Sequence, residues 1–154
     1  MTKETRILIK GGRVIDPRNN LDGIRDILVE SGKISKVAEV IPNGAGEKID
    51  ATGKIIIPGI VDMHVHLREP GREDKETVSS GTRAALKGGV TSVLAMPNTT
   101  PAMDSPENVS VLKNIIAQTA QANVFICGAI TKNRQGKELA DIAGLKKGGH
   151  SCYF

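Results

Sequence analysis

The sequence predicts an α/β fold in which three strand–helix units follow a small β unit. Over residues 1–57, short β-type runs are interrupted by Gly11-Gly12 and by Ser31-Gly32, and such pairs are hairpin signals. Over residues 58–147, apolar strand-like runs alternate with helical stretches. Because parallel strands need long crossover connections, this alternation is typical of a parallel sheet covered by helices.

Residues 1–57 are expected to form a small antiparallel β unit. The segments TRILIKGGRVID and IRDILVESGKISKVA each contain two β-type runs around a glycine-containing turn. The segment NGAGEKIDATGK is rich in turn residues, which predicts a loop with a short strand inside it.

The helices and strands of residues 58–147 have local start and stop signals. The segment KETVSSGTRAALKGG predicts a helix that ends at Gly88-Gly89, and Pro97 stops the strand VTSVLAMPN. The next helix is expected to begin with Ser105 as N-cap, Pro106 at the first helical position and Glu107 in the first turn. The segments NVFICGAI and GKELADIAGLKK predict a third strand and a third helix.

The composition argues against several classes of function. The chain has 154 residues, a net charge of +4 and 2% aromatic residues. Scattered basic residues with almost no aromatic side chains argue against nucleic-acid binding, whereas a mildly positive balance suits a small anionic substrate. No apolar run is long enough for a membrane span or a signal peptide, and the two cysteines form no metal-type or redox pair. We therefore expect a cytoplasmic protein in which Cys127 is a buried apolar residue.

One strand-like run, GIVDMHVHLREPG at residues 59–71, ends in polar side chains. Alternate residues of a strand share a face, which gives this run one polar and one apolar face. The polar face carries Asp62, His64, His66 and Arg68. The apolar face, against which helices are expected to pack, carries Val61, Met63, Val65 and Leu67.

The histidine pair of this strand has two interpretations. A bare H-x-H is most often an accidental pair on a solvated strand. Here the pair ends an apolar run, and burying it beside a carboxylate and a guanidinium is costly unless the groups coordinate or pair. Two neutral imidazoles two residues apart can bind one metal ion, so metal binding is favoured. Asp62 is expected to orient the ligands, and no role is given to Glu69, Glu73 and Asp74.

Three segments carry a resemblance to a known family: ATGKIIIPGIVD, DMHVHLREPGREDKE and SGTRAALKGGVTSVLAMPNTTP. They resemble the dihydroorotases of the amidohydrolase superfamily, and the match covers roughly residues 5–147. The resemblance implies that residues 58–147 are the first three strand–helix units of a (β/α)8 metal-dependent hydrolase barrel. It also implies that residues 1–57 are N-terminal strands of a small β-sandwich.

The resemblance implies roles for four residues. His64 and His66 correspond to two zinc ligands, and His66, Arg68 and Asn98 correspond to residues that contact the substrate. Arg68 would hold the substrate carboxylate, since a guanidinium matches that planar group. The alternatives are a surface salt bridge for Arg68 and a turn residue after Pro97 for Asn98. No catalytic residue is assigned in this chain, and it offers at most a partial site for the one or two zinc ions of the family.

The implied activity is the zinc-dependent, reversible cyclisation of N-carbamoyl-L-aspartate to dihydroorotate in pyrimidine biosynthesis. The expected partner is this small molecule, without nucleic acid or membrane, and the full-length enzyme could be a homo-oligomer. A hydantoinase, dihydropyrimidinase or allantoinase is the alternative enzyme, but Arg68 and Asn98 favour a substrate with a carboxylate. A non-enzymatic, partner-binding subunit is the alternative outside enzymes.

Residues 148–154, GGHSCYF, depart from the family pattern and are expected to be out of frame. Deleting one base near the Lys147 codon turns the tail into Ala-Gly followed by strand-forming residues, when suitable codons are chosen. His150 is therefore not expected to be a ligand, and the chain is expected to be truncated and inactive. A cloned fragment and a genuine short protein are the alternatives.

Overall fold

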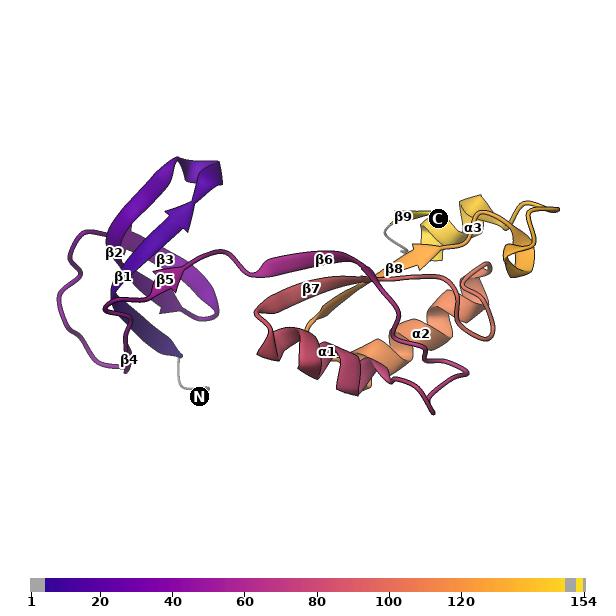
Figure 1. The fold of residues 1–154 in the computed structure, drawn as a ribbon, viewed down its shortest axis with the longest axis horizontal. Helices are drawn as coiled ribbons and strands as arrows, with labels where there is room; N and C mark the ends of the chain where they lie inside the picture. The colour runs from indigo at the N-terminus through magenta and orange to yellow at the C-terminus, as the bar shows by residue number, and fades with distance from the viewer. Residues whose placement is uncertain (1–4, 149–151, 154) are drawn as a thin grey trace. The chain divides into compact units, whose positions relative to one another are not determined.

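The computed structural model describes residues 5–148, 152 and 153. The chain divides into two compact units, Met1–Pro58 and Gly59–Phe154 (Figure 1). Most of the predicted out-of-frame tail, including His150, lies outside the described residues.

The N-terminal unit is a single mixed sheet with the strand order β3-β2-β1-β4, in which β5 also pairs with β1. Its strands are β1 (Arg6–Asp16), β2 (Leu21–Glu30), β3 (Lys33–Ala38), β4 (Glu47–Asp50) and β5 (Ile55–Ile56). The first three strands are antiparallel, but β4 and β5 run parallel to β1. The expectation of a purely antiparallel unit is therefore wrong, because the long connection after β3 returns the chain in the direction of β1.

The Gly11-Gly12 pair lies inside one continuous strand and not at a hairpin turn. The pairing of β1 with β2 shifts register between Ile9 and Gly12, which is a bulge, and Gly11 has a φ of 72°. Glycine adopts this left-handed conformation without steric cost, so the pair bends the strand instead of ending it. The hairpin expected at Ser31-Gly32 is confirmed, with φ values of 50° and 76° between β2 and β3.

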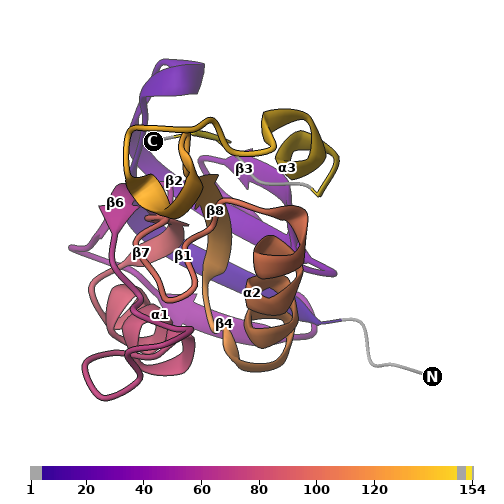
Figure 2. The ribbon, with the colours of Figure 1, turned by 90° about the vertical axis from the view of Figure 1, so that its right-hand side faces the viewer.

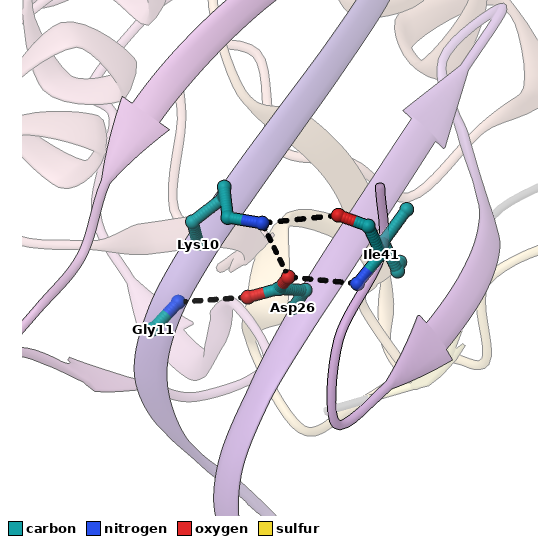
Figure 3. Close-up of polar contacts among 4 residues, drawn as sticks. All are labelled: Lys10, Gly11, Asp26 and Ile41. Carbon is teal, nitrogen blue, oxygen red and sulfur yellow. Dashed lines mark hydrogen bonds and ion pairs between the residues drawn. The ribbon is translucent and has the colours of Figure 1, made fainter. Parts of the chain in front are cut away.

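Asp26 of β2 ties this bulge to the segment after β3 (Figure 3). Its side chain is buried, and its two oxygens accept hydrogen bonds from the amides of Gly11 at 3.0 Å and Ile41 at 2.9 Å. The ammonium of Lys10 lies 2.8 Å from the same carboxylate and also donates to the Ile41 carbonyl at 3.0 Å. These donors, first the Ile41 amide and then Lys10, lower the pKa of Asp26.

Asp26→Asn is expected to speed amide hydrogen exchange at Ile41 by about 10- to 100-fold, because a hydrogen bond to a charged group contributes about 1.5–3 kcal/mol. A carboxyl whose pKa is lowered by folding stabilises the fold above its ordinary value of 3.8, and this stabilisation is lost as the pH falls through the folded pKa. The exchange rates at Ile41 in the parent protein and in the Asp26→Asn variant should therefore converge below the folded pKa of Asp26. Asp22→Asn is the control, since Asp22 forms an exposed pair with Arg13. Equal exchange in the Asp26 and Asp22 variants would contradict the role given to Asp26.

The second unit is the expected alternation of strands and helices. Its elements are β6 (Ile60–Val65), α1 (Val78–Lys87), β7 (Val90–Ala95), α2 (Pro106–Thr119), β8 (Asn123–Gly128), the short 3-10 turn η2 (Lys132–Arg134), α3 (Ile142–Gly148) and β9 (Cys152–Tyr153). The strands form a parallel sheet in the order β6-β7-β8-β9, and α1 and α2 lie against one face of it (Figures 1 and 2). The two-residue strand β9 was not predicted from the sequence. None of the helices in the described part of the chain is long and apolar enough to cross a bilayer.

The ends of the first two helices confirm the local signals. Ser105 caps α2 by accepting from the amide of Asn108, with Pro106 and Glu107 in the first turn. The helix α1 ends before Gly88, as predicted, and Thr77 caps its start. The helix α3 is shorter than predicted, because the residues before it bend back in a bridge between Thr131 and Leu139.

The core of this unit lies between the sheet and the helices. Its buried residues are Leu67, Val78, Ala95, Met103, Val109, Leu112, Ile126, Ala140 and Leu145. Cys127 is also fully buried, as expected. The apolar face predicted for the histidine strand is only partly covered, because Leu67 is buried whereas Val61 and Met63 are 59% and 70% exposed. The packing expectation is thus wrong for Val61 and Met63.

Candidate functional site

Polar side chains gather where β6 ends. His64 lies on β6 and His66 follows it, and their ring centroids are 5.1 Å apart in an edge-to-face arrangement. The carboxylate of Asp62 accepts from the backbone amide of His64 at 3.0 Å, next to a register shift in the pairing of β6 with β7. This local geometry holds both imidazoles at the carboxyl end of the strand, on an exposed part of the unit.

Asn98, which follows β7, contacts the second imidazole. Its Oδ1 lies 2.8 Å from Nδ1 of His66. An amide oxygen only accepts, so this contact is a hydrogen bond in the tautomer that carries the proton on Nδ1, and that tautomer has its lone pair on Nε2. A histidine that binds a metal ion is commonly oriented in this way, by a hydrogen bond from its other nitrogen.

These side chains open into a cavity of about 490 Å³. It is lined by His64, His66, Met96, Pro97, Asn98, Ile130, Thr131, Arg134 and Gly136. The lining residues come from the segments that end β6, follow β7 and follow β8, so the cavity lies at the carboxyl ends of three adjacent parallel strands. Ligands bind preferentially at this edge of parallel sheets.

The structure brings together three of the four predicted site residues. Arg68 lies just after the histidines, half-buried and with a φ of 63°, and it does not line this cavity. Four residues of the segment 130–136 also line the cavity, and this segment was not singled out from the sequence. Its position after the third predicted strand is the signal that could have found it, since that end of a parallel strand is where sites collect.

The loop carboxylates after Arg68 have structural partners. Glu69 accepts from the amide of Val78 at the start of α1, at 2.7 Å, and Glu73 accepts from the amide of Gly71 at 2.8 Å. Asp74 pairs with Arg72 at 2.8 Å, and this pair lowers the pKa of Asp74. Hydrogen bonding within the loop thus accounts for all three without a role in the site.

The donor set fits part of a zinc site. Two adjacent imidazoles, one of them oriented through Nδ1, are suitable ligands. Among the described residues, however, no group of three or more histidine, cysteine or acidic side chains could hold a metal ion. A catalytic zinc site has about three protein ligands, so His64 and His66 can be only part of one.

Comparison with known proteins identifies the family. A family model described as dihydro-orotase-like matches residues 53–153. The chain belongs to this family. The dihydro-orotase-like chain is 57% identical over 144 residues to the dihydroorotase of Elusimicrobium minutum, covering 94% of this chain and 33% of the relative. It is 48% identical over 144 residues to that of Trichlorobacter lovleyi, covering 93% and 34%. The chain thus spans about a third of the length of these curated relatives.

Two of the solved structures that share this fold are hydantoinases. L-hydantoinase from Arthrobacter aurescens matches with a TM-score of 0.84 at 23% identity, over 96% of this chain and 32% of that one. D-hydantoinase from a Thermus species matches with a TM-score of 0.71 at 27% identity, over 92% and 30%. The family resemblance predicted from the sequence is therefore confirmed. The α/β architecture of this chain recurs in the two hydantoinases.

Proposed function

We propose that this chain forms part of the active site of a dihydroorotase, which reversibly closes N-carbamoyl-L-aspartate to dihydroorotate. The observation that carries the proposal is the cavity at the carboxyl ends of β6, β7 and β8, in which His64, His66 and Asn98 meet. Identity of up to 57% to dihydroorotases supports this substrate over others. The enzyme would act on this small molecule in the cytoplasm, for pyrimidine synthesis.

The proposed architecture follows from the same comparison. Residues 58–147 would supply the first three strand–helix units of a (β/α)8 barrel, and the N-terminal sheet would form part of a β-sandwich. The third of the L-hydantoinase that this chain matches supports such an arrangement at the level of the fold. Residues 148–154 would be out of frame.

The reaction joins the carbamoyl nitrogen to the side-chain carboxyl carbon and releases water; hydrolysis of the ring reverses it. A bound zinc ion would supply Lewis-acid polarisation of the reacting carbonyl group. Nε2 of His66 and the imidazole of His64 would hold the ion, and Asn98 would fix the ring of His66 through Nδ1. The remaining ligands and the proton-transfer group would come from outside these residues.

A related cyclic amidase is the second candidate, because the matched solved structures are hydantoinases. A carboxylate separates the two substrate classes. Dihydroorotate carries one and hydantoin does not, so a cationic group in the site favours dihydroorotate.

A chimera tests the proposal directly. The matched 144-residue segment of this chain would replace its counterpart in the Elusimicrobium minutum dihydroorotase. We expect the chimera to cyclise N-carbamoyl-L-aspartate and to leave hydantoin unchanged, with the parent enzyme as control. A folded, zinc-loaded chimera that hydrolyses hydantoin, or that has no cyclisation activity, would contradict the proposal.

Arg68→Met in this chimera is expected to raise KM for N-carbamoyl-L-aspartate by about 10- to 100-fold, since a charge-assisted hydrogen bond contributes about 1.5–3 kcal/mol. Zinc content should stay the same, because a guanidinium is no zinc ligand. Steady-state kinetics and metal analysis measure both. Arg72→Met is the control from the same loop, since Arg72 pairs with Asp74. Loss of zinc in the Arg68 variant would show that the assigned role is wrong.

A further inference from the structure

The loop after β8 places one strong cation on the cavity that contains the histidines. Of the nine described residues that line this cavity, Arg134 alone carries a permanent charge, and none is acidic. Met96, Pro97 and Ile130 supply apolar wall, which strengthens the field of a nearby charge. The cavity is therefore suited to an anionic ligand.

Among the described residues, no neighbouring carboxylate cancels the charge of Arg134. Within the described part of the chain, no acidic side chain lies at ion-pair distance from its guanidinium. The acidic residue of this loop, Glu138, pairs instead with Lys132. Lys132 belongs to the same turn but does not line the cavity. Lys132 is thus paired within its own loop, whereas the guanidinium of Arg134 can bind a ligand in the cavity.

The turn that carries Arg134 is held by several hydrogen bonds. The carbonyl of Thr131 accepts a hydrogen bond from the amide of Arg134 at 3.0 Å. The hydroxyl of Thr131 accepts one from the amide of Gly136, also at 3.0 Å. Asp104 accepts the amide of Asn133 at 2.6 Å, which ties the turn to the segment before α2. This arrangement keeps Asn133 and Arg134 in left-handed conformations, with φ values of 50° and 59°. Such conformations are costly for arginine and concentrate at functional sites.

We propose that Arg134 is a specificity-determining residue, which binds the substrate carboxylate and selects carboxylate-bearing ring amides over uncharged ones. This inference rests on the proposed function. It adds to the role given to Arg68, since a carboxylate has two oxygens and accepts hydrogen bonds from more than one guanidinium. The residue acts by positioning substrate, so its loss changes binding more than the chemical step.

The test uses the chimera and two ligands that differ by the carboxylate alone, dihydroorotate and 5,6-dihydrouracil. Equilibrium dissociation constants are measured by calorimetry for Arg134→Met, Arg134→Lys and the control Lys132→Met. Arg134→Met should weaken the binding of dihydroorotate by about 10- to 100-fold and leave the affinity for dihydrouracil unchanged. Arg134→Lys should retain part of the affinity, and Lys132→Met should bind as the parent does. In turnover, Arg134→Met should raise KM for N-carbamoyl-L-aspartate while kcat stays within about threefold.

The inference is overturned if Arg134→Met binds dihydroorotate as tightly as the parent, or if it weakens both ligands equally. If that variant does not fold, the same comparison is made with Arg134→Lys, for which parent-like preference for dihydroorotate with unchanged affinity overturns the inference. Binding is measured without turnover, so the two proposals can fail separately. A chimera that binds dihydroorotate through Arg134 but does not cyclise overturns only the proposed function. A chimera that cyclises but is insensitive to Arg134 overturns only this inference, and a chimera that binds neither ligand overturns both.

Discussion

His64→Ala or His66→Ala in the chimera will lower turnover by about 1000-fold or more and will lower zinc content as well. Each change removes one of the two imidazoles, whose rings lie 5.1 Å apart. Loss of a ligand weakens zinc binding, and the polarisation that zinc supplies is worth several kcal/mol, at about 1.4 kcal/mol for each factor of ten. Turnover and metal analysis of the purified variants measure the two effects.

Met63→Leu is the matched control, because Met63 immediately precedes His64 in sequence and is 70% exposed. It should keep both zinc and activity. Asn98→Ala should give an intermediate loss of about 10- to 100-fold, because it removes the partner of His66 but no ligand. Full zinc content in both histidine variants would refute the metal role.

Features decided by neighbouring residues could be predicted from the sequence. The start of α2 depends only on the nearby residues Ser105, Pro106 and Glu107, because a capping side chain satisfies backbone amides of the same turn. The Ser31-Gly32 turn is equally local, since two residues with positive φ are what a tight hairpin requires. The histidine pair was found in the same way, from strand alternation over a few residues.

Features decided across the fold could not be predicted. Gly11-Gly12 resembles a turn, but Asp26 from the neighbouring strand accepts the Gly11 amide and stabilises a bulge. Arg134 belongs to no recognisable motif, and its place after a predicted strand is the one signal that it could belong to a site. Arg134 lines the same cavity as His64 and Asn98 only because β8 pairs with β7. The order of strands is a property of the whole sheet, which a local sequence pattern does not contain.

The exposed apolar residues of β6 have a consequence for the 154-residue polypeptide expressed alone. Ile60, Val61 and Met63 are 45%, 59% and 70% exposed, on a strand at the edge of its sheet. Neighbouring residues on a strand face opposite sides, so both sides of β6 present apolar groups. Phe125 on β8 is also 49% exposed. An edge strand of this kind favours association with other chains.

This polypeptide should therefore be poorly soluble, without a cooperative unfolding transition, and inactive. Apolar surface left in water forfeits about 25 cal/mol per Å², so a few hundred Å² of such surface costs roughly 8 kcal/mol. This loss removes most of a typical free energy of unfolding, which is about 5–15 kcal/mol. Two imidazoles are also too few ligands for a catalytic zinc ion. Solubility, thermal unfolding and zinc-dependent cyclisation of residues 1–154 are compared with the chimera, in which the remainder of the parent enzyme can cover β6. A soluble monomer with a sharp transition would refute the folding argument, and turnover above a zinc-only control would refute the chemical one.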